Sequence, residues 1–130
     1  MLHLEARLRE EIVAHARDRA PEEACGLIAG KAGRPTRAIR CANTHPTPTT
    51  RYLIAPRDQL RAFREMDDHG EELVAIYHSH PASQPYPSPT DRAEAHYPEA
   101  AYILISLRTA NAEVRAYRIA DDMVRELPLT

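Results

Sequence analysis

The sequence lacks several features that would point to common classes of protein. No stretch approaches the ~20 apolar residues that a membrane-spanning helix needs, and the charged opening segment 1–20 has no apolar core of the kind found in signal peptides. We therefore expect a cytoplasmic protein that has no membrane partner. There is also no basic excess, because the formal net charge is -2. Nucleic acid is therefore not an expected partner.

Cysteine is scarce. Only Cys25 and Cys41 are present, and neither belongs to a Cys-x-x-Cys pair, so the sequence does not support a zinc ribbon, a thioredoxin motif or a disulfide scaffold. A single Cys25–Cys41 disulfide is conceivable but disfavoured in a reducing compartment. Cys25 lies within an apolar run, where free cysteine usually packs as a small hydrophobe. A thiol peptidase that uses Cys25 and a histidine is therefore a weak alternative.

The composition is that of an ordinary globular protein. Of the 130 residues, 43% are hydrophobic and 28% are charged, and this length suits one core. We expect residues 1–130 to form a single domain. The spacing of four residues between Leu4, Leu8, Ile12 and Ala16 predicts an amphipathic helix that ends before Pro21.

The remaining chain alternates between apolar runs and segments of helical spacing. Leu60, Phe63 and Met66 recur every third residue before Gly70, which predicts a second helix over 57–69. Apolar or alternating runs predict strands at residues 24–30, 36–43, 51–56, 72–80, 101–107, 112–120 and 123–129. The first two should form a hairpin around a loop at 31–35, and 90–97 should be a short helix. This order predicts an α/β fold with a single mixed β-sheet flanked by helices.

His78 and His80 come at the end of the predicted strand 72–80. Because successive side chains on a strand point to opposite faces, the two imidazoles should share one face while Ser79 points to the other. Such a pair commonly offers two nitrogen ligands to zinc, whose catalytic sites take three protein ligands and leave one position open. Taken alone, the pair has a plainer interpretation as two partly exposed histidines beside a loop.

A carboxylate follows the histidines after a proline-rich loop. Seven residues separate His80 from Ser88, and two more separate Ser88 from Asp91. The loop can fold the start of the next helix over the strand end, which would bring Asp91 to the histidines as a third ligand. The segment is also a good helix start, with Ser88 as N-cap, Pro89 at the first helical position and an acid in the first turn. The two interpretations are compatible.

Together with an upstream glutamate, these residues resemble the signature of the JAMM (MPN-plus) zinc metalloproteases, which is Glu, His-x-His-Pro and Ser-x-x-Asp. The resemblance implies the MPN fold, which is akin to that of cytidine deaminases. It also implies that His78, His80 and Asp91 bind Zn2+ and that Ser88 stabilises the oxyanion. The deaminase chemistry itself is not expected, because the sequence has no Pro-Cys-x-x-Cys.

The resemblance also implies a general base. The family pattern places this acid three residues before a glycine, which selects Glu23, three residues before Gly26, over the adjacent Glu22. Glu23 would then accept a proton from the water that zinc activates and pass it to the departing amine. The other five histidines show no shared spacing, and we expect surface or capping positions for His3, His15, His45, His69 and His96.

The segments flanking the motif, NTHPTPTTRYLIAP and RAYRI, resemble a small prokaryotic branch of CysO-type cysteine peptidases, which process ubiquitin-like sulfur-carrier proteins. This implies a peptidase or isopeptidase that cuts an amide bond at the C-terminal tail of a small β-grasp carrier ending in Gly-Gly. A non-catalytic MPN scaffold is the alternative, because many relatives have lost ligands, although here every ligand position is filled. The kind of amide bond and the oligomeric state stay open.

Overall fold

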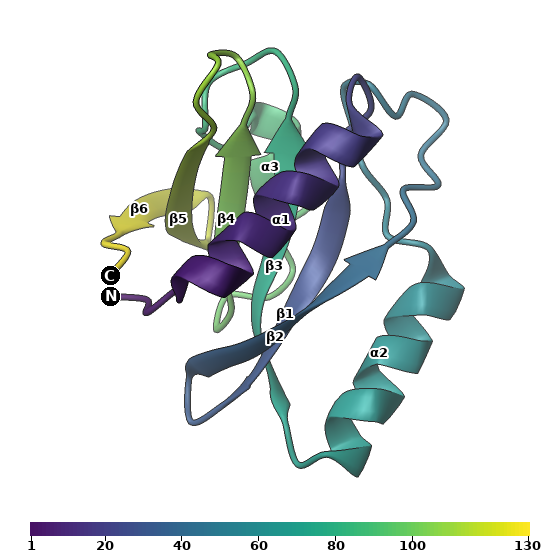
Figure 1. Ribbon diagram of the computed structural model, residues 1–130, viewed down its shortest axis with the longest axis vertical. Coiled ribbons are helices and arrows are strands. Elements are labelled where there is room, and N and C mark those ends of the chain that lie inside the picture. Colours follow the sequence, from purple (N-terminus) through teal and green to yellow (C-terminus); the bar gives the residue numbers. More distant parts are fainter.

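The computed structural model describes residues 1–130 as one six-stranded sheet with three helices (Figure 1). The helices are α1 (Ala6–Arg19), α2 (Pro56–Asp68) and α3 (Pro89–Ala93). The strands are β1 (Cys25–Lys31), β2 (Arg34–Cys41), β3 (Glu72–His80), β4 (Ala101–Ser106), β5 (Glu113–Ala120) and β6 (Met123–Leu127). None of the helices combines the length and apolar character needed to cross a membrane. The predicted mixed α/β fold is confirmed.

The strand order is β2-β1-β3-β4-β5-β6, and the sheet is mixed. All neighbouring strands are antiparallel except β3 and β4, which run parallel. A parallel pair needs a long crossover connection, and here that connection carries the proline-rich segment and α3. The topology therefore places α3 after the C-terminal end of β3, next to the two histidines.

The two faces of the sheet are covered by different helices. Leu8, Ile12 and Ala16 of α1 are fully buried and pack with the strand residues Ile28, Tyr77 and Ile103. Ala62 and Met66 of α2 pack with the alternate set on the opposite face, which includes Leu27, Ile76 and Leu104. Figure 1 shows α1 lying across one face of the sheet. Because Ile76 belongs to the α2 face, the alternation of β3 directs the side chains of residues 78 and 80 to that face as well.

Three predictions for residues 31–60 were wrong. The β1–β2 connection is a two-residue turn, not a five-residue loop, because Ala32 and Gly33 both adopt positive φ, as tight hairpin turns require. Residues 51–56 form no strand: Ile54 makes one isolated bridge, to Asn43, and Pro56 begins α2, since its fixed φ suits a first helical position. In α2, Leu60 is 53% exposed, so it does not belong to the buried stripe.

Candidate metal centre

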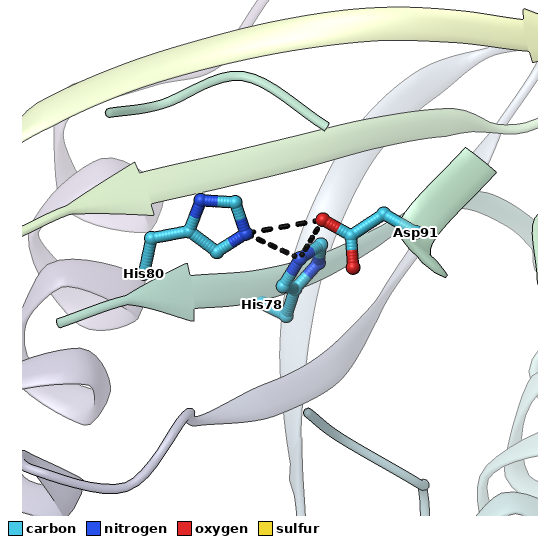
Figure 2. Close-up of side chains that lie close together, drawn as sticks. All are labelled: His78, His80 and Asp91. Carbon is cyan, nitrogen blue, oxygen red and sulfur yellow. Dashed lines mark hydrogen bonds and ion pairs between the residues drawn. The ribbon is translucent and has the colours of Figure 1, made fainter. Parts of the chain in front are cut away.

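The two histidines of β3 are buried and turn toward one another (Figure 2). Their Nε2 atoms lie 3.2 Å apart, and each lies 3.1 Å from Oδ2 of Asp91. The Nδ1 atom of His80 is within hydrogen-bonding distance of the Gln84 carbonyl, at 2.8 Å. A proton on Nδ1 would make this hydrogen bond and leave the Nε2 lone pair free. The predicted common face of His78 and His80 is confirmed, and the structure brings Asp91 to it.

Asp91 reaches the histidines through the cap of α3. Ser88 is the N-cap: its Oγ accepts the Asp91 N–H at 3.0 Å, and its own N–H donates to Asp91 Oδ2 at 2.9 Å. Pro89 occupies the first helical position. The carboxylate oxygen that closes this capping box is the same atom that faces both imidazoles. The helix cap and the ligand cluster are therefore one structure.

The geometry of the cluster is compatible with a bound metal ion. The ligand atoms of His78, His80 and Asp91 all lie within 4.8 Å of one another. Tetrahedral coordination with bonds of about 2.0–2.1 Å separates ligand atoms by roughly 3.3–3.4 Å. The separations of 3.1–3.2 Å found here are close to that value. Two imidazole nitrogens and one carboxylate oxygen also form a donor set that transition metals favour.

The electrostatics favour the metal-binding form of His78 and Asp91 but not that of His80. Burial lowers the pKa of His78 despite the opposing contact with Asp91, so this imidazole is neutral at pH 7. Burial raises the pKa of Asp91, but hydrogen bonds from His78 and His80 outweigh burial and hold the pKa far below its usual range. For His80, burial lowers the pKa, and contacts with Asp91 and the Gln84 carbonyl raise it overall. Metal ligation requires neutral imidazole and ionised carboxylate.

Glu23 lies beside this cluster, and Glu22 does not. Cys25 is paired with His78 in the β1–β3 register, and extending that register by two residues places Glu23 opposite His80. Glu23 is only 5% exposed, and its Oε1 atom is buried without a hydrogen-bond partner. Glu22 instead pairs with Arg19 at 3.0 Å on the surface. The preference for Glu23 therefore agrees with the geometry.

The environment of Glu23 suits proton transfer. Burial raises the pKa of its carboxyl to about 7, with Asp91 adding to the rise and His80 opposing it. A carboxyl group that titrates near neutral pH can both accept and return a proton in one reaction cycle. The orphaned Oε1 atom is available for a water or a substrate group.

Several contacts around the site were not predicted from the sequence. Tyr52 stacks on His78, with ring centroids 4.4 Å apart. The proline-rich segment is anchored at two points: Ser106 Oγ donates to the Ser83 carbonyl at 2.6 Å, and the Tyr117 hydroxyl donates to the Pro85 carbonyl. These residues are far apart in sequence, so no local pattern reveals their contacts.

The cysteines and the remaining histidines do not form a second site. Cys25 and Cys41 are free and buried, and burial raises the pKa of their thiols to about 12 and 11. A nucleophilic thiol needs a lowered pKa, so these values oppose the thiol-peptidase alternative. The prediction for His15 was wrong, because its side chain is buried and its Nδ1 lies 2.6 Å from the Tyr77 hydroxyl. Its position three residues after Ile12, on the apolar stripe, was the available signal.

The comparison with protein families agrees with this geometry. Residues 5–120 match the family described as prokaryotic homologs of the JAB domain. The chain belongs to this family. The JAB/MPN resemblance inferred from the motif is thereby confirmed.

Several curated relatives can be aligned with most of the chain. The CysO-cysteine peptidase of Mycobacterium tuberculosis is 44% identical over 99% of this chain and 90% of its own length. The desampylase of Haloferax volcanii is 34% identical over 97% of this chain and 93% of its own length. A probable TtuB-protein conjugate cleaving protease of Thermus thermophilus is 41% identical over 75% of this chain and 65% of its own length. All three names describe hydrolases.

Solved structures confirm the fold. The solution structure of a protein from Desulfitobacterium hafniense matches with a TM-score of 0.90 and 32% identity, covering 100% of this chain and 92% of that one. A JAB1/MPN domain protein from Archaeoglobus fulgidus matches with a TM-score of 0.64 and 18% identity, covering 99% and 98%. Because its sequence identity is only 18%, the second match supports the fold and carries no argument about function.

Proposed function

We propose that this chain is a zinc-dependent peptidase that hydrolyses an amide bond at the C-terminal tail of a small ubiquitin-like sulfur-carrier protein. The observation that carries the proposal is the cluster of His78, His80 and Asp91 next to the buried carboxyl of Glu23. Membership of the JAB family and the names of the relatives support the same reaction. Residues 1–130 would act as one domain.

His78, His80 and Asp91 would hold the metal ion. Nitrogen and carboxylate ligands with an open position favour zinc over magnesium or calcium, which prefer oxygen ligands. When bound, zinc supplies a Lewis acid that lowers the pKa of water to about 7 and polarises a carbonyl group. The contact with the Gln84 carbonyl orients the His80 ring for this role.

Glu23 and Ser88 would move the proton and stabilise the developing charge. Glu23 accepts the proton of the attacking water and returns it to the departing amine, which its pKa of about 7 allows. Ser88 Oγ accepts the Asp91 N–H with one of its two lone pairs, which leaves the hydroxyl proton free. That proton can be donated to the oxyanion.

The names of the relatives support the proposed class of substrate. One name specifies a cysteine joined to CysO, and another specifies a conjugate of TtuB with protein. A carrier that ends in Gly-Gly would present a thin, extended tail, which we place beside the segment from Gln84 to Pro87. The scissile bond would be either a peptide bond to a cysteine or an isopeptide bond to a lysine.

Two substrates test the proposal. A CysO-type carrier with one added C-terminal cysteine presents a peptide bond, and the same carrier joined to a lysine side chain presents an isopeptide bond. Cleavage of at least one should require zinc, stop with a chelator and return when zinc is added. Glu23→Gln should retain zinc and lower kcat by at least ~10²-fold. Glu22→Gln, which changes a partly exposed neighbour, should leave kcat unchanged.

The outcomes separate the parts of the proposal. Cleavage that continues after complete removal of zinc would exclude the metal mechanism. A zinc-loaded Glu23→Gln variant that cleaves at the wild-type rate would remove Glu23 from the reaction. A protein that binds zinc and the carrier but cleaves neither substrate would favour the non-catalytic scaffold.

A further inference from the structure

The side chain of Asn43 is the centre of a hydrogen-bond network beside the site. It lies two residues after the end of β2, at the start of the connection to α2. Its Nδ2 atom donates its two N–H groups to the carbonyls of Glu23 and Arg51, both at 3.0 Å, and lies 3.4 Å from the Pro48 carbonyl, which can only share one of these hydrogens. Its Oδ1 atom accepts the N–H groups of His45 and Leu53, both at 3.0 Å. One amide thus binds Glu23 and four positions of the loop 44–53.

The backbone of Glu23 depends on this loop. Its N–H donates to the Pro48 carbonyl at 2.7 Å, and its carbonyl accepts from Asn43 at 3.0 Å. On the next residue, Ala24, the N–H donates to Ser79 Oγ at 2.8 Å. The carboxyl of Glu23 is therefore carried by a backbone that the loop holds on one side and β3 holds on the other.

The Asn43 side chain also holds the backbone on both sides of Tyr52, the residue that covers His78. Arg51 and Leu53, which flank Tyr52, both bond to Asn43. Tyr52 stacks on His78. Prolines interrupt this loop, so it cannot form a regular strand ladder, and a side-chain amide supplies the missing backbone partners. Among uncharged side chains, only an amide offers both two donors and a carbonyl acceptor.

We infer that Asn43 is a positioning residue that sets the place of the Glu23 carboxyl relative to the His78–His80–Asp91 cluster. The inference rests on the proposed function, because it assumes that Glu23 handles the proton. The Asn43 side chain makes no hydrogen bond with His78, His80 or Asp91. Its loss should therefore displace Glu23 while all three ligands stay in place, and because Asn43 also bonds beside Tyr52, the rate is compared on zinc-loaded protein. A displacement of about 1 Å at a catalytic group can lower the rate ~10²-fold.

Two substitutions and one control test this inference on the carrier with the added cysteine. Asn43→Ala removes every one of these side-chain bonds, whereas Asn43→Asp has the same shape and keeps the two accepted bonds but loses the donated ones. Both should lower kcat by roughly 10- to 100-fold per zinc-loaded molecule, with zinc stoichiometry unchanged. Thr44→Val is the matched control: it removes a bond to the Leu53 carbonyl in the same loop without touching Glu23, and kcat should be unchanged. If the first two variants do not fold, kcat is measured on zinc-loaded Asn43→Ser, which keeps one donor and one acceptor. A kcat within twofold of wild type would then overturn the inference.

A double-mutant cycle separates positioning from general support of the fold. In the Glu23→Gln background, Asn43→Ala should cause no further fall in kcat, because the group that it positions is already lost. Losses that multiply in the double variant, or an Asn43→Asp enzyme with kcat within twofold of wild type, would overturn the inference. Wild-type activity in Glu23→Gln alone would instead overturn the proposed function.

Discussion

The ring of Tyr52 lies almost parallel to the imidazole of His78, with 4.4 Å between centroids and 22° between planes. The Nδ1 atom of His78 is buried without a hydrogen-bond partner. Metal-binding histidines are usually oriented by a hydrogen bond from the second ring nitrogen. At His78, stacking against Tyr52 orients the imidazole in place of such a hydrogen bond. The orientation of this ligand therefore depends on an aromatic side chain.

Replacing Tyr52 should therefore weaken zinc binding. Tyr52→Ala removes the stacked ring and frees the imidazole to rotate, and we expect the dissociation constant for zinc to rise about tenfold, as for the loss of other supporting contacts. Tyr52→Phe keeps the ring and should bind zinc like the wild type. Competition with a chromophoric chelator measures both constants. Equal affinities of the Ala and Phe variants would show that stacking does not hold His78.

Ser88 should have two separable effects. Ser88→Ala loses the helix cap, which should lower the free energy of unfolding by ~1 kcal/mol, and it loses the hydroxyl donor, which should lower kcat by ~10²-fold. Ser88→Thr keeps both groups and should retain most of both properties. Thermal melts and steady-state rates on zinc-loaded protein measure the two effects. A zinc-loaded Ser88→Ala enzyme with wild-type kcat would leave Ser88 as a cap alone.

The parts of the site that could be predicted from sequence are local. β3 matches its predicted bounds, 72–80, because its apolar run stops at a proline-rich segment. The shared face of His78 and His80 follows from strand geometry, and the Ser88 cap follows from residue types within one turn. Each of these inferences needs only neighbours in the chain.

The parts that could not be predicted depend on contacts between distant segments. Asn43 and Glu23 are 20 residues apart, and Ser106 and Ser83 are 23 residues apart. Tertiary context also shortened the helix predicted at 90–97: α3 ends at Ala93 and buries none of its residues, so its cap and a few polar contacts stabilise it. The segment 51–56 was predicted as a strand because its composition is apolar, but its backbone groups bond to Asn43 instead.

His15 should make stability depend on pH. Burial lowers its pKa from 6.5 to about 4, with Arg40 and Arg19 adding to the fall and Asp18 opposing it. Between these two values the unfolded chain binds a proton that the folded chain does not, so stability is lost as the pH falls from above 6.5 toward 4. The full loss is roughly 3 kcal/mol, from 1.36 kcal/mol per pKa unit.

Urea unfolding at pH 7 and pH 4.5 measures this dependence. His15→Gln cannot titrate, so its free energy of unfolding should fall less over this range than that of the wild type. Tyr77→Phe removes the hydroxyl partner of His15 but leaves the imidazole buried, and it should retain the wild-type dependence because burial is the main cause. Parallel curves for wild type and His15→Gln would show that another group dominates acid unfolding.

Gly26, three residues after Glu23, is required by close packing. A Cβ atom there would overlap the ring of Tyr77 and lie 2.5 Å from the Ile39 carbonyl. Gly26→Ala should therefore lower the free energy of unfolding by about 3 kcal/mol. At Gly33, by contrast, nothing lies within 4 Å of a Cβ, and only the positive φ of 75° opposes a side chain. Gly33→Ala should cost ~1 kcal/mol.

A second substitution distinguishes the two sources of crowding at Gly26. Tyr77→Leu shortens the side chain on one side, but the Ile39 carbonyl is backbone and cannot move away without breaking the β1–β2 pairing. In the Tyr77→Leu background, Gly26→Ala should therefore still lower the free energy of unfolding. This loss should be larger than the loss that Gly33→Ala causes in the wild-type protein. Urea unfolding of the four variants measures these differences. If Gly26→Ala costs no more than Gly33→Ala, crowding is not what requires glycine three residues after Glu23.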